Sequence, residues 1–267
     1  MRRIYDLFVS GGKDSVTAAT IAYEEAEQQS IPVRVVFINE LKAFGIPEDL
    51  LPYTPVEYVK EFSKWLGADL LVLEPEFDYW AGVDRWGYPL LHHNRWCMYF
   101  LKQEPMRKLL VEEARQGLKP VWTFGIRQKE SWRRARIYRE KRMVWRHAGI
   151  PVENYYPILD WDDVKVDQFI RAKEIPENPM WAVGFSFECL CMAGMSRKKL
   201  DRAISLYPEL YRYIAKKDEE IQKRRRSKEP AYVMPLLNIK ETLHRYVEKK
   251  LKEPKLTKYF IKDLNEE

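Results

Sequence analysis

One short loop constrains what this chain can fold into more than any other feature of its sequence. The segment Ser10–Ser15 has the sequence Ser-Gly-Gly-Lys-Asp-Ser and lies between an apolar run at residues 4–9 and a helical pattern at residues 14–28. Two glycines in a strand-to-helix turn let the backbone turn sharply and bring N–H groups close to a ligand. The start of the helix adds unsatisfied N–H groups and a partial positive charge, and Lys13 adds a full one. We therefore predict a phosphate-binding loop, in which Asp14 either binds a magnesium ion or caps the helix.

Two better-known phosphate loops do not match this segment. The loop is shorter than a Walker A sequence, whose first glycine lies further from its Gly-Lys pair. It also lacks the Gly-x-Gly-x-x-Gly pattern of dinucleotide-binding folds. The remaining alternative is an ordinary strand-to-helix turn with a polar cap.

Short apolar segments alternate with helical patterns along the first half of the chain. Further strands are predicted at residues 33–38, 70–73 and 121–125, and helices at residues 54–65 and 103–116. This alternation is typical of a parallel sheet with crossover helices, and strands that are apolar throughout suit burial on both faces. The predicted fold class is therefore α/β, with a twisted parallel sheet flanked by helices.

The C-terminal part has a different pattern. From Glu153 onward we predict a largely helical elaboration of the same domain, with helices at residues 163–173, 196–227 and 239–252. The second of these is either one long helix or two helices joined at Pro208, because proline interrupts a helix.

The composition is that of a folded globular chain. Hydrophobic residues make up 46% of the 267 residues, which is enough apolar surface for a core. No apolar run of about 18 residues occurs, so we predict no membrane-spanning helix and no membrane partner. The segment Met1–Val9 continues directly into the loop and is more typical of a first strand than of a signal peptide. We therefore expect a cytoplasmic protein.

Positive charge is concentrated in two segments. Residues 127–146 hold nine basic and two acidic residues, and residues 197–228 hold twelve basic and five acidic ones, although the net charge of the chain is only +6. Such segments favour an anionic partner, and RNA is a candidate for both. Solvated basic helices are the alternative.

The chain has three cysteines, and so low and uneven a number argues against a disulfide framework. They are Cys97, Cys189 and Cys191. Their thiolates could hold an iron–sulfur cluster such as [4Fe-4S] with one open iron site. Two of them could instead form a redox pair or carry a persulfide, and all three could be buried and inert.

The loop resembles the Ser-Gly-Gly-x-Asp-Ser signature of the PP-loop superfamily, and further segments resemble its phosphoadenosine phosphosulfate (PAPS) reductase family. In chain order these segments are Val36–Glu40, Thr54–Val59, Arg95–Cys97 with Leu101, Lys102 and Pro105, Gly125–Arg127 with Glu130, Ser131 and Arg134, Pro157 and Ile158 with Trp161, Asp163 and Val164, Asn178–Met180 before Gly184, and the pair Cys189 and Cys191. Together they cover about residues 5–195 in the order that the family has.

The resemblance implies an adenine nucleotide alpha-hydrolase-like, Rossmann-like fold with the nucleotide at the carboxyl ends of the strands, as is general for open α/β sheets. It implies a nucleotide-binding domain over residues 1–195, followed by a helical C-terminal extension over residues 196–267. The implied nucleotide-binding residues are Ser10, Gly11, Gly12, Lys13, Asp14, Ser15, Asn39, Gly125, Arg127, Glu130 and Arg134. Of these, Lys13, Asp14 and Arg127 are the candidate catalytic residues, since a guanidinium at a strand end can hold a phosphate or sulfate with two hydrogen bonds.

Two departures separate this chain from the family members that make sulfite. Those reductases carry a C-terminal Glu-Cys-Gly-x-His tail with the nucleophilic cysteine, and this chain has no cysteine after Cys191. Asn39 and Glu40 stand where the family has Asp-Thr-Gly. Lys13 and Asp14 are more similar to the members that use ATP.

These observations favour an ATP pyrophosphatase that adenylates an acceptor in sulfur transfer, with ATP and Mg²⁺ as ligands and a separate sulfur donor. The acceptor would be a nucleic acid base or another group that is thiolated. A thiol-dependent reductase of PAPS or adenylyl sulfate is the second hypothesis, and a nucleotide-sensing, RNA-binding protein without catalysis is the third. The oligomeric state stays open, with a homodimer as one candidate.

Overall fold

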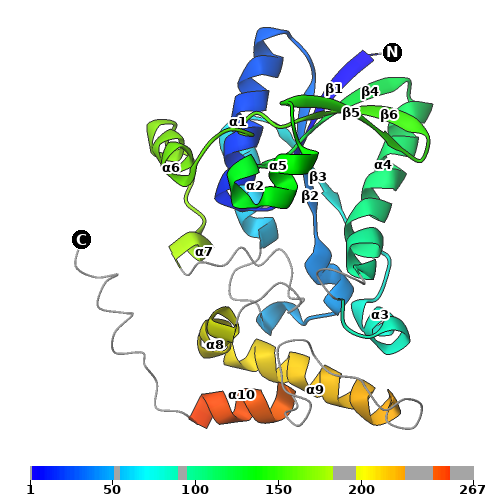
Figure 1. Ribbon diagram of the computed structural model, residues 1–267, viewed down its shortest axis with the longest axis vertical. Coiled ribbons are helices and arrows are strands. Elements are labelled where there is room, and N and C mark those ends of the chain that lie inside the picture. Colours follow the sequence, from blue (N-terminus) through cyan, green and yellow to red (C-terminus); the bar gives the residue numbers. More distant parts are fainter. Residues whose placement is uncertain (1, 51–54, 90–94, 183–196, 226–242, 253–267) are drawn as a thin grey trace. The chain divides into compact units, whose positions relative to one another are not determined.

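The structure of the protein is a computed structural model that describes residues 2–50, 55–89, 95–182, 197–225 and 243–252 (Figure 1). The chain forms two compact units. The first contains Met1–Ala43, Tyr53–Glu76 and Met98–Cys189, and the second contains Phe44–Pro52, Phe77–Cys97 and Leu190–Glu267. Within the described residues, no helix has the length and apolar character that crossing a bilayer would need.

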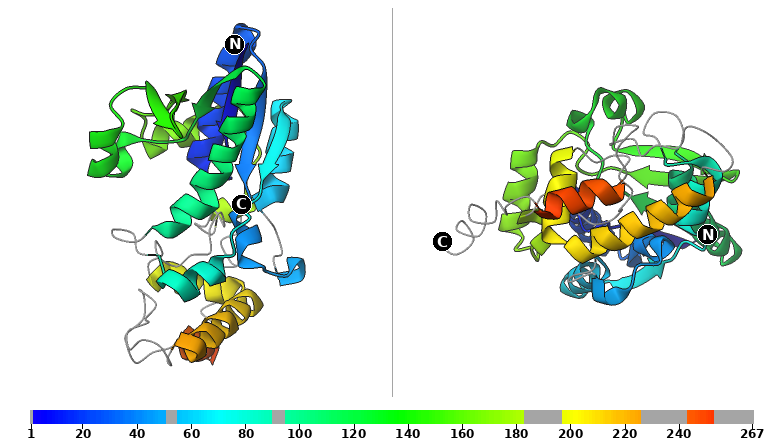
Figure 2. Two further views of the ribbon diagram at one scale, coloured as in Figure 1. Left: turned by 90° about the vertical axis from the view of Figure 1, so that its right-hand side faces the viewer. Right: turned by 90° about the horizontal axis from the view of Figure 1, so that it is seen from below.

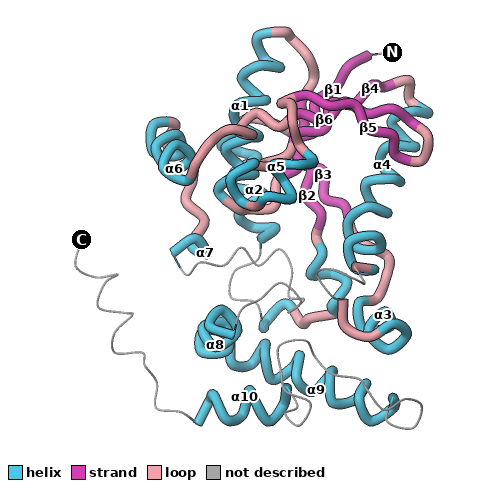
Figure 3. Tube along the Cα trace, in the orientation of Figure 1, coloured by secondary structure: helices cyan, strands magenta, loops and turns pink. Residues whose placement is uncertain are grey.

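A six-stranded sheet forms the centre of the first unit, and its strands are drawn in magenta in Figure 3. The strand order is β3-β2-β1-β4-β6-β5. The strands are β1 (Arg2–Phe8), β2 (Val33–Ile38), β3 (Asp69–Leu73), β4 (Leu118–Thr123), β5 (Arg142–His147) and β6 (Ile150–Tyr155). All neighbouring pairs are parallel except β5 and β6. The predicted α/β fold with a mostly parallel sheet is therefore confirmed.

Helices cover both faces of this sheet (Figure 1 and Figure 2). On one face lie α1 (Lys13–Gln28), α2 (Pro55–Leu66) and α6 (Asp163–Ala172). On the other lies α4 (Glu104–Arg115). Successive side chains of a strand point to opposite faces, so Leu7 packs in the core below α1 while Phe8 packs with α4.

Shorter elements connect these helices and strands. They are the 3₁₀ turns Glu40–Phe44, Glu48–Leu50 and Gln128–Glu130, the π-helical segment Met98–Gln103, and the short helices α5 (Trp132–Ile137) and α7 (Pro179–Ala182). The turn Gln128–Glu130 and α5 follow the end of β4, so the strand end, the turn and the helix form one continuous edge.

The largely helical part begins after Tyr155 rather than at Glu153, and the sequence did not predict the strands before it. Residues 142–155 form a β-hairpin, and its second strand β6 lies inside the sheet beside β4. Charged side chains in β5, and Pro151 and Glu153 in β6, hid the apolar pattern of these strands. The helices predicted after this hairpin agree with α6 and with the helices of the second unit.

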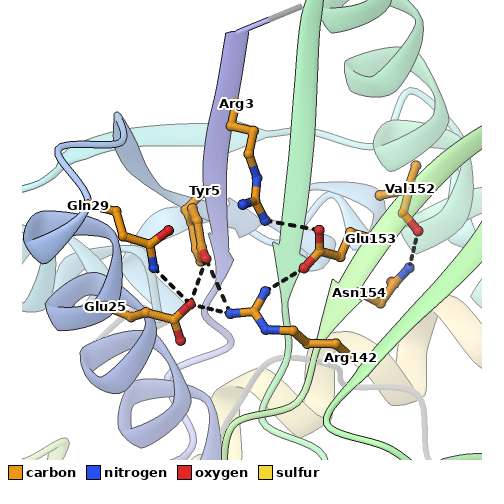
Figure 4. Close-up of polar contacts among 8 residues, drawn as sticks. All are labelled: Arg3, Tyr5, Glu25, Gln29, Arg142, Val152, Glu153 and Asn154. Atoms are coloured by element: carbon orange, nitrogen blue, oxygen red, sulfur yellow. Dashed lines mark hydrogen bonds and ion pairs between the residues drawn. The ribbon is translucent and has the colours of Figure 1, made fainter.

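Arg142 attaches the hairpin to the rest of the first unit (Figure 4). Its guanidinium pairs with Glu25 of α1 and with Glu153 of β6, and it donates a 3.2 Å hydrogen bond to the Tyr5 hydroxyl. Arg3 of β1 donates to the same Glu153 carboxylate at 3.0 Å. The hairpin is therefore held to both α1 and β1 by charge-assisted bonds, which are stronger than neutral ones.

The second unit contains α3 (Tyr79–Trp86), α8 (Arg197–Leu206), α9 (Pro208–Arg225) and α10 (Leu243–Lys252). Helix α8 ends at Leu206 and α9 begins at Pro208, which agrees with the predicted alternative of two helices joined at this proline. The sequence placed residues 44–52 and 77–97 in the nucleotide-binding domain, but they group with the C-terminal helices. The reason is local contact: Tyr88 donates a 2.6 Å hydrogen bond to buried Asp218, and Tyr213 donates to the Gly45 carbonyl at 2.7 Å.

Two buried carboxyl groups and one half-buried guanidinium meet between the sheet and α4. Arg34 of β2 pairs with Asp6 of β1 at 2.7 Å and with Glu113 of α4. One cation cannot balance two buried carboxylates, so one proton must stay with the pair. Burial, followed by the nearby Asp6 charge, raises the pKa of Glu113 to about 9, and burial also raises the pKa of Asp6.

The Glu113→Gln substitution should remove a pH dependence of stability. At neutral pH the folded chain keeps Glu113 protonated while the unfolded chain ionises it, so folding takes up a proton. The free energy of unfolding should therefore fall by up to about 1.4 kcal/mol per pH unit as pH rises from about 5 to 9. Urea unfolding at several pH values measures this slope, which should be much smaller in the variant.

Glu112→Gln is the matched control, because Glu112 lies on the same helix with an exposed side chain. It should keep the slope of the unmodified chain. Equal slopes in the Glu113→Gln variant and the unmodified chain would show that Glu113 is ionised in the folded state.

Candidate functional site

The predicted phosphate-binding loop connects β1 to α1, the strand and helix in blue in Figure 1. Gly11 has φ +84°, a left-handed conformation that a residue with a side chain rarely adopts. Inside the turn, the Ser15 hydroxyl donates to the Gly12 carbonyl at 2.8 Å and accepts from the Ser10 amide at 3.1 Å. Ser15 therefore holds the loop closed.

The first turn of α1 has no side-chain cap. Its N-cap is Gly12, which carries no side-chain oxygen, whereas Asp78, Ser131 and Asp162 cap α3, α5 and α6. The first N–H groups of a helix have no partner within the helix. At α1 the Ser15 amide donates to the Gly12 carbonyl at 3.0 Å, which leaves the amides of Lys13 and Asp14 to an anion at the positive end of the helix dipole.

A distant segment fixes the orientation of the loop. The Gly11 carbonyl accepts 3.0 and 2.8 Å hydrogen bonds from the side chains of buried Asn178 and of Trp181 in α7. With this oxygen held, the peptide plane of the loop cannot rotate freely. Asn178 belongs to a segment that resembled the family, but its contact with the loop depends on tertiary structure.

Gly125 brings the end of β4 against the start of α1. A Cβ atom at Gly125 would lie 2.4 Å from the backbone carbon and oxygen of Asp14 and 2.5 Å from the Ser15 nitrogen. These are backbone atoms at a helix start and cannot move aside. This position therefore requires glycine, and the close approach brings residues 126–130 to the phosphate-binding loop.

A cleft of about 630 Å³ lies at the carboxyl ends of β1, β2 and β4. Nine of the predicted site residues line it: Ser10, Gly12, Lys13, Asp14, Ser15, Gly125, Arg127, Glu130 and Arg134. Among the described residues, Gly11 and Asn39 are not part of its lining. Gly11 instead shapes the loop, and the Asn39 amide donates to the Leu73 carbonyl of β3 at 2.9 Å.

Each cation of the cleft is paired with a carboxylate. Buried Arg127 pairs with Asp14 at 2.9 Å and with Asp163 at 2.7 Å. The remaining pairs are Lys13 with Asp167 at 2.8 Å, Lys102 with Glu40 at 2.9 Å, and Arg134 with Glu130. The acids keep the cations in place, and an anionic ligand would compete with them.

Four of these residues were not among the predicted site residues: Glu40, Lys102, Asp163 and Asp167. The spacing of Asp163 and Asp167 is a sequence signal, because residues four apart lie on one face of a helix. No comparable signal connects Glu40 with Lys102, which meet only because the chain folds.

The role predicted for Asp14 as a magnesium ligand stays a prediction. Burial raises the pKa of its carboxyl group, and the Arg127 guanidinium opposes this shift. Among the described residues, no group of three or more metal-ligating side chains is present.

The wall of the cleft beside the loop is apolar and partly aromatic. Phe8 at the end of β1 and Phe124 just after β4 are stacked, with ring centroids 5.0 Å apart. Val36, Ile38 and Met106 continue this wall. A cleft with an apolar wall next to polar groups suits a ligand that has a planar ring and an anionic tail.

The structure describes one of the three cysteines predicted as cluster ligands. Cys97 is half-buried and directly precedes the π-helical segment of residues 98–103. Cys189 and Cys191 lie outside the described residues.

Gly125→Ala should disrupt the site, because the added methyl group overlaps the backbone of α1. Overpacking costs about 1–3 kcal/mol, and more where backbone must move. Gly12→Ala is the control, since its Cβ would meet only the Ser10 hydroxyl at 3.6 Å and its φ is −80°. Urea unfolding should show a large loss for Gly125→Ala and less than about 1 kcal/mol for Gly12→Ala. Equal stabilities would contradict the close approach.

Comparisons with known proteins agree with this geometry. The model of the phosphoadenosine phosphosulfate reductase domain matches residues 5–187. An uncharacterized protein of Methanocaldococcus jannaschii is 29% identical over 205 residues, which are 76% of this chain and 44% of that protein. An adenosine 5'-phosphosulfate reductase of Allochromatium vinosum is 24% identical over 184 residues, 64% of this chain and 65% of the reductase. The chain thus spans less than two thirds of either relative.

A crystal structure of PAPS reductase from Candida auris is 14% identical, with a TM-score of 0.42, and the match covers 69% of this chain and 79% of the reductase. That similarity is too distant to add to the assignment, which rests on the match over residues 5–187 and on the loop, sheet and cleft described above. The chain therefore belongs to the phosphoadenosine phosphosulfate reductase family of PP-loop proteins.

Proposed function

We propose that this chain is a nucleotide-binding enzyme that binds ATP in the cleft and cleaves it between the α- and β-phosphates in sulfur transfer. The family match supports a PP-loop nucleotide-binding enzyme. The observation that carries the proposal is the start of α1, which has a glycine cap and lies in a cleft with Lys13 and Arg127.

The cleft offers separate surfaces for the parts of the nucleotide. The phosphates would lie against the first turn of α1, where N–H groups and the helix dipole favour negative charge. The base would pack on the apolar wall of Phe8 and Phe124. Both surfaces are parts of the same continuous segments, since Phe8 directly precedes the loop and Phe124 directly precedes Gly125.

Lys13 and Arg127 would stabilise the charge that develops when the bond to pyrophosphate breaks. An oxygen of the acceptor attacks the α-phosphorus, the bond to the bridging oxygen breaks, and pyrophosphate leaves with the electron pair. Cations held in place before the reaction are effective in this role, because they need no reorganisation. A sulfur nucleophile would then displace AMP from the adenylated acceptor.

A magnesium ion would neutralise charge on the phosphates when bound, and carboxylate oxygens are suitable ligands for it. Asp14 is the residue we propose for this role. Its pairing with Arg127 means that metal and guanidinium would share one carboxylate.

A thiol-dependent reductase of PAPS or adenylyl sulfate is the second candidate. The similarity to the Allochromatium vinosum reductase favours it. A reductase of this kind needs a thiolate to attack sulfur, and Cys97, Cys189 and Cys191 are the cysteines of this chain.

Lys13→Ala should weaken binding of Mg²⁺-ATP about ten- to a hundredfold in calorimetric titration. A hydrogen bond to a charged group contributes about 1.5–3 kcal/mol, which corresponds to that factor. Lys173→Ala is the matched control: Lys173 pairs with Glu24 and lies 5.8 Å from the Phe169 ring, as Lys13 pairs with Asp167 and lies 5.8 Å from the Trp181 ring. Lys173 is not in the cleft lining, so its variant should bind as the unmodified chain does. Unchanged binding in Lys13→Ala would refute the assigned phosphate site.

The products distinguish the two candidates. Release of pyrophosphate from ATP supports adenylation. Release of sulfite from PAPS or adenylyl sulfate in the presence of a thiol, without pyrophosphate release from ATP, would replace the first candidate with the second.

We also propose Cys97, Cys189 and Cys191 as ligands of an iron–sulfur cluster. Thiolates are the usual ligands of such clusters. Protein purified without oxygen should then contain iron and acid-labile sulfide in equal amounts, and each Cys→Ser variant should contain less of both. Iron-free protein from cells with an adequate iron supply would remove the cluster from the proposal while leaving the nucleotide site intact.

A further inference from the structure

The surface formed by α5 and β5 has exposed aromatic side chains that do not pack into the core. Trp132 at the start of α5 is 76% exposed and Trp145 in β5 is 38% exposed. Val144, which precedes Trp145 in β5, points to the opposite face of the sheet and does not contribute to this surface. We call the exposed residues among 131–139, together with Trp145, the α5–β5 surface. Single exposed apolar side chains are common on protein surfaces, but exposed rings that lie among cations form a surface that can hold a partner.

The same surface carries guanidinium groups without carboxylate partners. Within the described part of the chain, no ion pair is found for Arg133, Arg136, Arg139 or Arg146, and all four are exposed. Arg146 lies on the opposite face of the sheet from Trp145, so the arginines beside the exposed tryptophans are Arg133, Arg136 and Arg139. Arg139 and Arg146 donate only to backbone carbonyls, those of Arg136 and Gly149. Glu140 is the one acidic residue among residues 131–147.

The cations that flank this surface are paired. Arg134 pairs with Glu130, Lys141 with Asp160, and Arg142 with Glu25 and Glu153. The second basic segment also differs from it, because Arg212, Lys217 and Lys223 of α9 pair with carboxylates of α9 and α10. The α5–β5 surface is therefore the better of the two candidates for a polyanion.

Aromatic rings are interleaved with these arginines. Tyr138 contacts Trp145 and Tyr156, with ring centroids 6.3 and 5.0 Å away. Trp132 extends from α5 with most of its ring in solvent. Rings of this kind stack on unpaired bases, while arginines bind the phosphates between them, so the combination suits a single-stranded nucleic acid. A second copy of the chain is disfavoured, because two like-charged surfaces would face each other.

The α5–β5 surface begins at the edge of the cleft. Glu130 and Arg134 line the cleft, and α5 starts between them, after Ser131. A strand bound along α5 therefore has one end of its path next to the phosphate-binding loop.

We propose that the α5–β5 surface binds a single-stranded nucleic acid and leads it to the cleft, so that the acceptor of the adenylyl group is a nucleotide of that strand. The role as acceptor rests on the proposed function, whereas the binding does not. RNA and single-stranded DNA share the chemistry that this surface recognises.

Fluorescence anisotropy with labelled oligo(U) and oligo(dT) tests the binding on the full chain. We expect binding that weakens steeply with salt and is weaker for a duplex of equal length. Trp132→Ala should weaken it about ten- to a hundredfold, because stacking on one aromatic ring contributes a factor of that order. Arg133→Glu with Arg136→Glu should weaken it further and reduce its salt dependence.

Two control variants lie on α2 of the same unit, where Lys60 and Lys64 are exposed and Trp65 is 38% exposed. Lys60→Glu with Lys64→Glu and, separately, Trp65→Ala should leave oligonucleotide binding unchanged. Circular dichroism and urea unfolding of every variant show whether it is folded. All substituted residues are exposed, so the comparison is among folded proteins.

The outcomes separate the surface from the nucleotide site. Trp132→Ala should bind Mg²⁺-ATP as the unmodified chain does, because Trp132 is not in the cleft lining, while its oligonucleotide binding falls. Failure of the surface and failure of the nucleotide site are therefore distinguishable. Equal binding of polyglutamate, or equal loss in the α2 variants, would mean general attraction to anions and would overturn the proposal, as would absence of binding. Stronger binding of oligo(U) than of oligo(dT) identifies RNA as the source of the strand, and the reverse identifies DNA.

Discussion

The close approach of Gly125 to the start of α1 is the contact on which the site depends. It joins the end of β4 to the end of β1, the two strands at the centre of the sheet. Only with this contact can Arg127 reach Asp14 and the turn after β4 lie against the phosphate-binding loop. A side chain at this position would overlap the backbone of Asp14 and Ser15, so the contact between the end of β4 and the start of α1 requires glycine.

Electrostatics follow from this geometry. The site gathers four cations, and each is held by a carboxylate, which prevents repulsion in the absence of a ligand. Beyond the cleft, on α5 and β5, this pairing ends and four arginines have no carboxylate among the described residues. The balance of charge inside the cleft and its excess outside are consistent with a small anionic ligand in one place and a longer polyanion in the other.

Part of the fold and of the site could be predicted from the sequence. The strand-loop-helix start, the parallel strands and the cleft residues of the loop were expected, because apolar periodicity and the glycine-rich loop are local signals. Gly125, Arg127, Glu130 and Arg134 were expected from the resemblance to the family. The β5–β6 hairpin was missed, since an edge strand with charged side chains lacks the apolar run of a buried strand. The grouping of residues 44–52 and 77–97 with the C-terminal helices was missed because it depends on contacts such as Tyr88 with Asp218.

The sequence by itself determined the glycine-rich turn between β1 and α1, the α/β fold and the family, because each is encoded in short segments whose spacing along the chain is sufficient. Tertiary structure alone decided which groups meet in the cleft. Three pairs of residues that are distant in sequence meet because of the order of the strands in the sheet. They are Lys102 and Glu40, Lys13 and Asp167, and Asn178 and Gly11. The tertiary structure also decided which arginines have a carboxylate partner. An ion pair depends on the distance between two side chains in space, whereas the sequence shows only which residues are charged.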